Sequence, residues 1–263
     1  MISQPNAHPM KTKSICLTAV IAALVFATTA PASTPLDDAR AALKTNNLAQ
    51  AEALLAPLTG ADAQDPVALL TLSQVRLAQK NTLSAIELAE RATKLDATKP
   101  EYFAQLGRAL GQRMGEISFV QQAFLSGKLK RAFEKTVELD PHNVGGLIGL
   151  ARYYTNAPEI AGGSLEKAQE FALRVQQIVP FLGEIEQGNI ASHDEKFADA
   201  LAHYEAAANL NPSNVEAQNQ CGRMLAKLKR TTEARIRFAA ALKLDPNLDS
   251  AKKALADLDA EKH

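Results

Sequence analysis

A repeated pattern of small and apolar residues limits what this chain can fold into. The pattern is clearest over residues 215–248, where two amphipathic helical segments are joined by a turn. Cys221, Leu225 and Leu228 follow the i, i+4, i+7 spacing of one helix face. Pro246 ends the second segment, because proline lacks the N–H that a continuing helix needs. The stretch therefore predicts a helix-turn-helix unit.

Related spacings recur along most of the chain, which indicates an array of such units. Six repeats and a final helix are predicted, at about residues 32–65, 66–99, 100–143, 144–180, 181–214 and 215–248, with a cap over 249–263. Ordering each residue costs about 1–2 kcal/mol of backbone entropy, and one helical hairpin buries too little apolar surface to offset it. Neighbouring units must therefore share their apolar faces.

The pattern resembles the tetratricopeptide repeat (TPR). The resemblance rests on small, aromatic and proline positions, which are Cys221-Gly222, Ala234, Phe238, Ala241 and Pro246. Two positions depart from the family pattern, since Gln218 stands where tryptophan is usual and Leu225 where tyrosine is usual. The resemblance implies an all-α fold, a right-handed α-solenoid of about six helix-turn-helix units with a C-terminal capping helix.

Two repeats carry insertions between their helices. About ten extra residues lie within 113–128, and they include Ile117, Phe119, Val120, Phe124 and Leu125, which are costly to expose. We expect them to pack as an extra turn or a lengthened second helix, bounded by Gly115 and Gly127.

The other insertion, about five residues within 157–164, carries Gly162-Gly163, whose amides could bind an anion. Both insertions fall in the same turn of successive repeats and are expected side by side on one edge. They either form a binding site or cap the stack locally.

The N-terminal residues 1–32 have the features of a secretory signal peptide. Lys11 and Lys13 precede an uncharged run that ends in Ala30-Pro31-Ala32, a small-residue cleavage motif. The sequence predicts cleavage after Ala32 and export, with the periplasm as the location. An uncleaved membrane anchor is the alternative, since the uncharged run is just long enough to span a bilayer.

Composition argues against several classes of partner. The chain has 29 basic and 29 acidic residues, so no overall positive charge attracts nucleic acid or an anionic membrane. A membrane contact is expected only through the signal sequence, if it is uncleaved. The predicted mature chain keeps one cysteine, Cys221, at a core position of its repeat, where burial as a small hydrophobe is expected.

No pattern in the sequence predicts catalysis, a cofactor or a metal site. His193 and His203 lack a cysteine or carboxylate at ligand spacing, and no G-x-S-x-G or H-E-x-x-H motif occurs. Ser126-Gly127-Lys128 lacks the upstream glycine of a phosphate loop. The chain is therefore predicted not to be an enzyme.

A column of polar residues is the candidate binding site. In the TPR family the first helices line a concave face, and one position on them is polar in all six repeats. We call this set the polar column; its members are Arg40, Gln74, Arg108, Arg152, Asn189 and Arg223. Arginine forks suit carboxylates and backbone carbonyls, so the column predicts an extended, acidic peptide as ligand. The alternative is that each arginine pairs with an acidic residue of a neighbouring repeat.

Together these features predict a non-catalytic scaffold or adaptor of the cell envelope that binds a peptide or protein segment in the concave TPR groove. The alternative is an oligomeric or small-molecule-binding TPR component of an envelope transport or assembly system.

Overall fold

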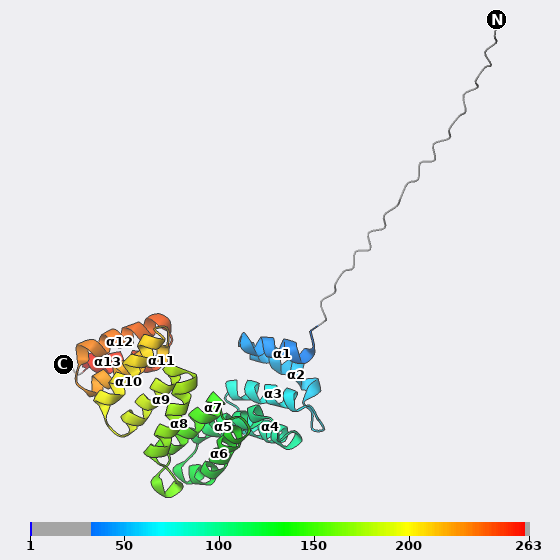
Figure 1. Ribbon diagram of the computed structural model, residues 1–263, viewed down its shortest axis with the longest axis horizontal. Coiled ribbons are helices and arrows are strands. Elements are labelled where there is room, and N and C mark those ends of the chain that lie inside the picture. The colour runs from blue at the N-terminus through cyan, green and yellow to red at the C-terminus, as the bar shows by residue number, and fades with distance from the viewer. Residues whose placement is uncertain (2–32, 261–263) are drawn as a thin grey trace. The chain divides into compact units, whose positions relative to one another are not determined.

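The structure, a computed structural model, describes Met1 and residues 33–260. In this part of the chain thirteen α-helices and two short 3-10 helices follow one another, and there is no strand (Figure 1). The prediction of an all-α helical-repeat fold is confirmed. The predicted signal peptide, residues 1–32, lies outside the described residues apart from Met1.

The helices form six pairs and a single last helix. The first members, here called A helices, are α1 (Pro35–Lys44), α3 (Pro66–Ala78), α5 (Pro100–Met114), α7 (Val144–Asn156), α9 (Pro180–His193) and α11 (Val215–Lys227). The second members, the B helices, are α2 (Leu48–Leu55), α4 (Thr82–Leu95), α6 (Phe119–Leu139), α8 (Leu165–Ile178), α10 (Phe197–Leu210) and α12 (Thr231–Leu244). The 3-10 helices are η1 (Ala56–Leu58) and η2 (Glu159–Ala161), and α13 (Asp249–Ala260) comes last.

Each helix packs on the next one in the chain, so neighbouring pairs share their buried faces. Four A helices begin with a proline, at Pro35, Pro66, Pro100 and Pro180. Proline is favourable there because the first N–H of a helix has no intrahelical acceptor. The sequence thus marks the start of most A helices by itself.

The turn inside a pair repeats its backbone geometry. Asn46, Lys80, Glu195 and Lys229 all have left-handed backbone, with φ between 57° and 61°. In the last of these turns the Arg230 N–H donates to the Leu225 carbonyl at 2.9 Å, which closes the end of α11. The α5–α6 and α7–α8 turns, which carry the insertions, have no such residue among the described ones except Gly162, with φ 87°.

A glycine on the A helix lies against an aromatic ring of the B helix in three pairs. A Cβ atom built on Gly107, Gly188 or Gly222 would lie 2.5–2.7 Å from the ring of Phe133, Tyr204 or Phe238. The glycines are therefore required for the helices to approach over the rings.

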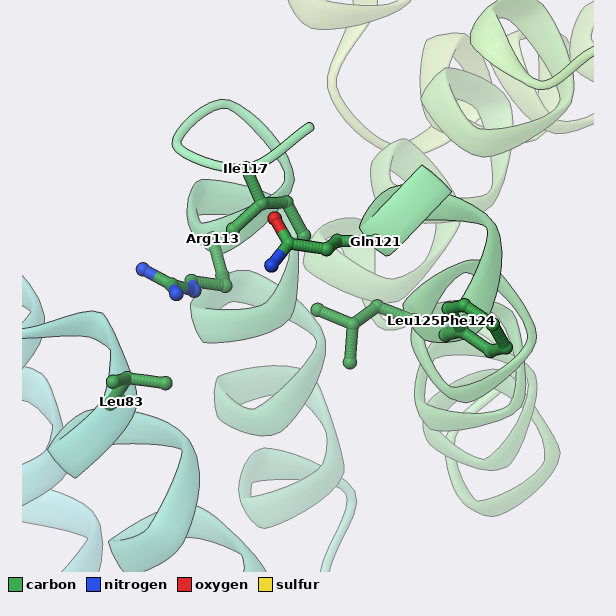
Figure 2. A pocket seen from close by; sticks show the side chains of 6 residues that line it. All are labelled: Leu83, Arg113, Ile117, Gln121, Phe124 and Leu125. Atoms are coloured by element: carbon green, nitrogen blue, oxygen red, sulfur yellow. The ribbon is translucent and has the colours of Figure 1, made fainter. Parts of the chain in front are cut away.

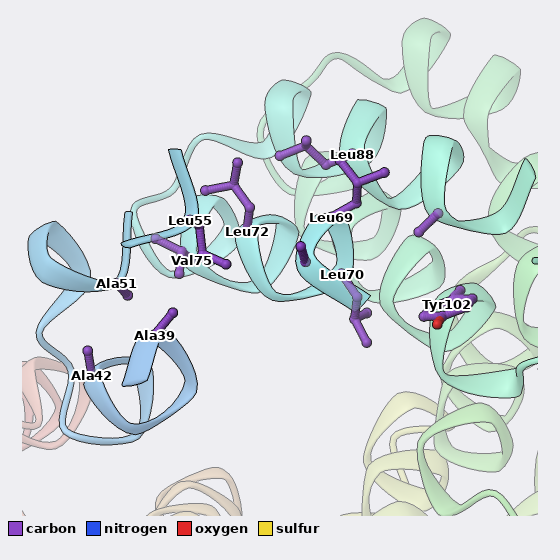
Figure 3. Packing of buried hydrophobic residues seen from close by; sticks show 12 residues of the cluster. Ala39, Ala42, Ala51, Leu55, Leu69, Leu70, Leu72, Val75, Leu88 and Tyr102 are labelled. Carbon is purple, nitrogen blue, oxygen red and sulfur yellow. The ribbon is translucent and has the colours of Figure 1, made fainter. Parts of the chain in front are cut away.

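The first two pairs pack without such a ring. Their core uses small side chains and leucines, among them Ala39, Ala42 and Ala51 (Figure 3). At the glycine position of α3 stands Ser73, whose hydroxyl donates to the Ala85 carbonyl of α4 at 2.7 Å.

The insertion within 113–128 lengthens a B helix, which is one of the two forms expected from the sequence; the other was an extra turn. Helix α6 has 21 residues and begins at Phe119, while Gly115 follows the end of α5. Gly127 lies inside α6, so the prediction that it bounds the insertion was wrong.

The prediction that the apolar side chains of the insertion pack was also wrong in part. Leu125 and Ile117 are half-buried, but Phe119, Val120 and Phe124 are exposed because the first turns of α6 extend beyond the helices that cover the rest of it.

The ring of Phe133 supplies a stability test, because it contacts glycines on two helices. Added Cβ atoms on Gly107 of α5 and Gly149 of α7 would each lie 2.5 Å from the ring, which therefore has no room to move aside. We predict that Gly149→Ala destabilises the fold by about 1–3 kcal/mol through overpacking. Gly111→Ala on α5 is the control, since its Cβ would meet only Leu129 at 3.9 Å. It should be neutral or stabilising by up to about 1 kcal/mol, since alanine favours helix over glycine. Urea unfolding of both variants measures the difference, and equal midpoints would contradict the packing.

Candidate binding face on the A helices

The polar column lies on the solvent side of the A helices. Arg40, Arg108, Arg152 and Arg223 are exposed, while Gln74 and Asn189 are half-buried. The A helices also touch one another in succession from α1 to α9, so the column runs along one continuous face from Arg40 to Asn189. The structure therefore places these residues on one side but gives them different surroundings.

Arg152 belongs to a network inside the fold. Its Nε and Nη2 atoms donate to the carboxylate of Glu186 on α9 at 2.6–3.1 Å, and Glu186 is only 2% exposed. The Asn189 amide donates to the same carboxylate at 3.2 Å, and the Tyr204 hydroxyl donates to Asn189 Oδ1 at 2.7 Å. Arg152 thus pairs with an acidic residue of the next repeat, as the alternative hypothesis proposed. Asn189 is held in the same network.

Arg108 has the opposite environment. It makes no hydrogen bond or ion pair with the residues that the structure describes. Protein atoms around the exposed guanidinium lower its pKa, because burial disfavours the charged form. A cation that is partly desolvated and lacks an acidic partner favours an anionic ligand.

The other members of the column fall between these extremes. Arg223 Nη1 donates to the amide oxygen of Gln220 at 3.1 Å, which leaves its charge without an acidic partner in the described chain. Arg40 lies 3.8 Å from Asp37 in an exposed i, i+3 pair, and such pairs contribute little. Arg40 and Arg223 therefore remain available alongside Arg108.

Charges on this face act across two pairs of helices. Burial raises the pKa of Tyr102 on α5, and the positive charge of Arg40 on α1 partly opposes that shift. Burial acts to lower the pKa of Arg152. The hydrogen bonds and charge of Glu186 and the charge of Glu216 on α11 act in the other direction and outweigh burial, so the net shift of this pKa is upward. A charge on one A helix therefore acts on groups of A helices further along the chain.

Sequence reasoning missed two acidic residues that organise this region. Glu186 occupies a buried helix position three residues before Asn189, and a carboxylate on an otherwise apolar face was the available signal. Glu184 accepts from Gln176 at 2.5 Å and lies 2.8 Å from His203 Nδ1. That pair joins α9 to α10 and has no signature in a linear motif, because the two residues are 19 positions apart.

The insertion within 157–164 does not present free amides. The Gly162 N–H donates to the Glu159 carbonyl at 2.8 Å, and the Gly163 N–H donates to the Pro158 carbonyl at 3.0 Å. The Tyr153 hydroxyl donates to the Ala161 carbonyl at 2.6 Å and fixes the loop to α7. The anion site considered from the sequence is therefore wrong, and local capping describes this loop.

Cys221 is fully buried in the α11–α12 core, as the repeat pattern predicts. Burial raises the pKa of its thiol to about 11, so the thiol stays protonated and unreactive near neutral pH. Among the described residues, no three His, Cys, Asp or Glu side chains are grouped to hold a metal ion. None of the helices in this part of the chain is long and apolar enough to cross a bilayer.

Comparison with known proteins identifies the repeat. A family model described as "Tetratricopeptide repeat" matches residues 36–100 and 185–249. No curated protein has a significantly similar sequence. The fold is similar to a thermophilic TPR protein of Thermus thermophilus, with 20% identity, TM-score 0.62 and coverage of 74% of this chain and 98% of that one.

Two further solved structures share the fold at low identity. PilW, described as a widely conserved type IV pilus biogenesis factor, has 14% identity, TM-score 0.66 and coverage of 84% and 96%. Pseudomonas aeruginosa pilF has 17% identity, TM-score 0.52 and coverage of 74% and 90%.

The family match and the paired helices define a helical-repeat protein. This chain belongs to the tetratricopeptide-repeat family. Proteins of this family are generally non-catalytic scaffolds that bind protein or peptide partners.

Two of the four arginines of the column, Arg152 and Arg108, give different stability predictions. Arg152→Ala leaves the buried Glu186 carboxylate with Asn189 as its remaining donor. We expect a loss of about 2 kcal/mol, less than for a fully buried pair because half of the Arg152 side chain is exposed. Arg108→Ala is the control and should leave stability nearly unchanged, since it breaks no hydrogen bond or ion pair with the described residues. Thermal melts of both variants measure the two losses of stability, and an equal loss would contradict the different roles of Arg152 and Arg108.

Proposed function

We propose that this protein is a non-catalytic scaffold of the cell envelope that binds an extended, acidic peptide segment along its A helices. The observation that carries the proposal is Arg108, a partly desolvated guanidinium without an acidic partner in the described chain. Arg40 and Arg223 extend the positive surface on the same face. Carboxylates of a ligand would supply the counter-charge that the protein does not provide.

The polar column then divides into two roles. Arg108, Arg223 and Arg40 are the proposed contacts to the ligand, and Gln74 lies among them as a half-buried amide. Arg152 and Asn189 hold the face in shape through Glu186, although the outer side of Arg152 remains reachable. All six residues of the column thus belong to the proposed face, as ligand contacts or as its support.

The envelope location is supported by the signal-peptide pattern of residues 1–32. Structures of the same fold include PilW, described as a type IV pilus biogenesis factor, which is compatible with an envelope role. The identity of PilW to this chain is 14%, so the location rests on the N-terminal pattern.

Binding to the face is tested with a peptide array that varies the number and spacing of Asp and Glu residues. We predict that the best peptides are acidic and that their affinity falls as salt rises, because ion pairs are screened. Arg108→Ala combined with Arg223→Ala should weaken binding by about tenfold or more and reduce the salt dependence.

Arg131→Ala is the matched control, since Arg131 is an exposed arginine on the B helix α6. It should leave affinity unchanged. The proposal fails if the double variant binds as wild type, or if the control loses as much affinity.

Export has its own test. When the full chain is produced in a bacterium, we predict a periplasmic protein whose mass corresponds to a start at Ser33. The mechanism is cleavage after the Ala30-Pro31-Ala32 motif. Ala30→Asp together with Ala32→Asp should block processing, and recovery of unprocessed wild-type protein in the cytoplasm would contradict the location.

A further inference from the structure

The start of helix α6 exposes an unusual amount of apolar surface. Phe119, Val120 and Phe124 are 71%, 66% and 83% exposed, and Leu83 at the start of α4 is 63% exposed. We call these four residues the α6 apolar face. Val120 and Phe124 are four residues apart and share one side of the helix. Clustered large apolar side chains in water are unfavourable, and they usually mark a contact surface.

A cleft adjoins these side chains. It has a volume of about 280 Å³ and is lined by Leu83, Arg113, Ile117, Gln121, Phe124 and Leu125. Figure 2 shows Leu125 of α6 and Leu83 of α4 on opposite sides of it, with Ile117 on the α5–α6 loop. The volume falls just below the range of about 300–1,000 Å³ typical of small-molecule sites, and suits a protruding side chain.

The charges beside the cleft are balanced. Arg113 Nη1 lies 3.1 Å from Glu116 Oε2, and the Thr82 hydroxyl donates to the same carboxylate oxygen at 2.6 Å. Lys128 of α6 pairs with Glu90 of α4. Each of these two ion pairs is neutral, so neither supplies the positive charge by which apolar membrane-binding segments commonly attract an anionic lipid surface. The occupant is therefore expected to carry both signs of charge around an apolar centre.

We propose that a second copy of this chain docks on the α6 apolar face through a two-fold symmetric contact. In such a contact the same surface serves both partners, so it must hold both the protruding group and the cavity that receives it. This face has exposed phenylalanines beside a cleft of side-chain size.

Its surrounding charges are also self-complementary, since Arg113 of one copy can pair with Glu116 of the other. The exchange costs little, because the existing i, i+3 pair is partly exposed and weak. An apolar centre with a polar, charge-paired rim is the usual composition of a protein interface.

The docking surface is separate from the proposed peptide face. The α6 apolar face lies on the B helices α4 and α6. Its rim includes Arg113 in the last turn of the A helix α5, but Arg40, Arg108 and Arg223 of the peptide face do not line the cleft. A dimer would carry two peptide faces, which raises the apparent affinity for a partner with repeated acidic segments.

Sedimentation equilibrium and light scattering of the purified protein test the proposal between about 1 and 100 µM. We expect a concentration-dependent rise from monomer to dimer mass. Phe124→Asp should raise the dimer dissociation constant by about tenfold or more, because a charge would be buried at the centre of the contact. Phe124 is exposed, so this variant should keep the wild-type circular dichroism and melting temperature.

Ile236→Asp on α12 is the matched control, an exposed isoleucine away from α6, and should leave the dimer unchanged. Arg113→Glu should weaken the dimer, and adding Glu116→Arg should restore it. A wild-type protein that stays monomeric at the highest concentration overturns the proposal. A dimer that Phe124→Asp does not affect, or a monomer that binds anionic vesicles through Phe119 and Phe124, overturns it as well.

The two proposals can fail independently. Arg108→Ala with Arg223→Ala should leave the mass distribution unchanged, and Phe124→Asp should leave the affinity of a single acidic peptide unchanged.

Discussion

The contact between a small residue on each A helix and the side chain that faces it from the B helix organises this structure. Where the B helix carries an aromatic ring, as with Phe133 or Phe238, the A helix has a glycine that lets the ring approach. In the first two pairs, which lack such a ring, alanine or serine stands at the glycine position, as Ala39 and Ser73. Because this contact fixes which side of an A helix is buried, it also fixes which side faces solvent.

The same constraint explains why chemically similar arginines differ in role. The residue after each small position points away from the partner helix, and it is exposed at the four arginines and half-buried at Gln74 and Asn189. What it meets there depends on the next A helix. Arg152 meets Glu186, which needs a cation because it is buried, whereas Arg108 meets no carboxylate in the described chain. A periodic position therefore gave a common location without a common function.

The two insertions show how the repeat tolerates extra residues in different ways. The loop before α8 satisfies its own N–H groups and is held by Tyr153. The inserted residues from Phe119 onward form the first turns of α6, where Phe119, Val120 and Phe124 stay exposed within the described chain. The loop before α8 is therefore complete by itself. The exposed side chains of α6 need a partner, so the proposed docking surface is centred on B helices, whereas the proposed peptide face lies on the A helices.

The sequence alone determined the helices and their order, because proline starts, apolar spacing and small residues such as Gly222 act locally and recur along the chain. It also located the polar column, since one position in a repeat has one orientation. Only the tertiary structure decided that Arg152 is paired and Arg108 is not, and that Phe119 and Phe124 remain exposed. Those outcomes depend on which residues of other helices come within a few ångströms. Contacts such as Arg152 with Glu186, 34 positions apart, are set by how the pairs stack and leave no local pattern in the sequence.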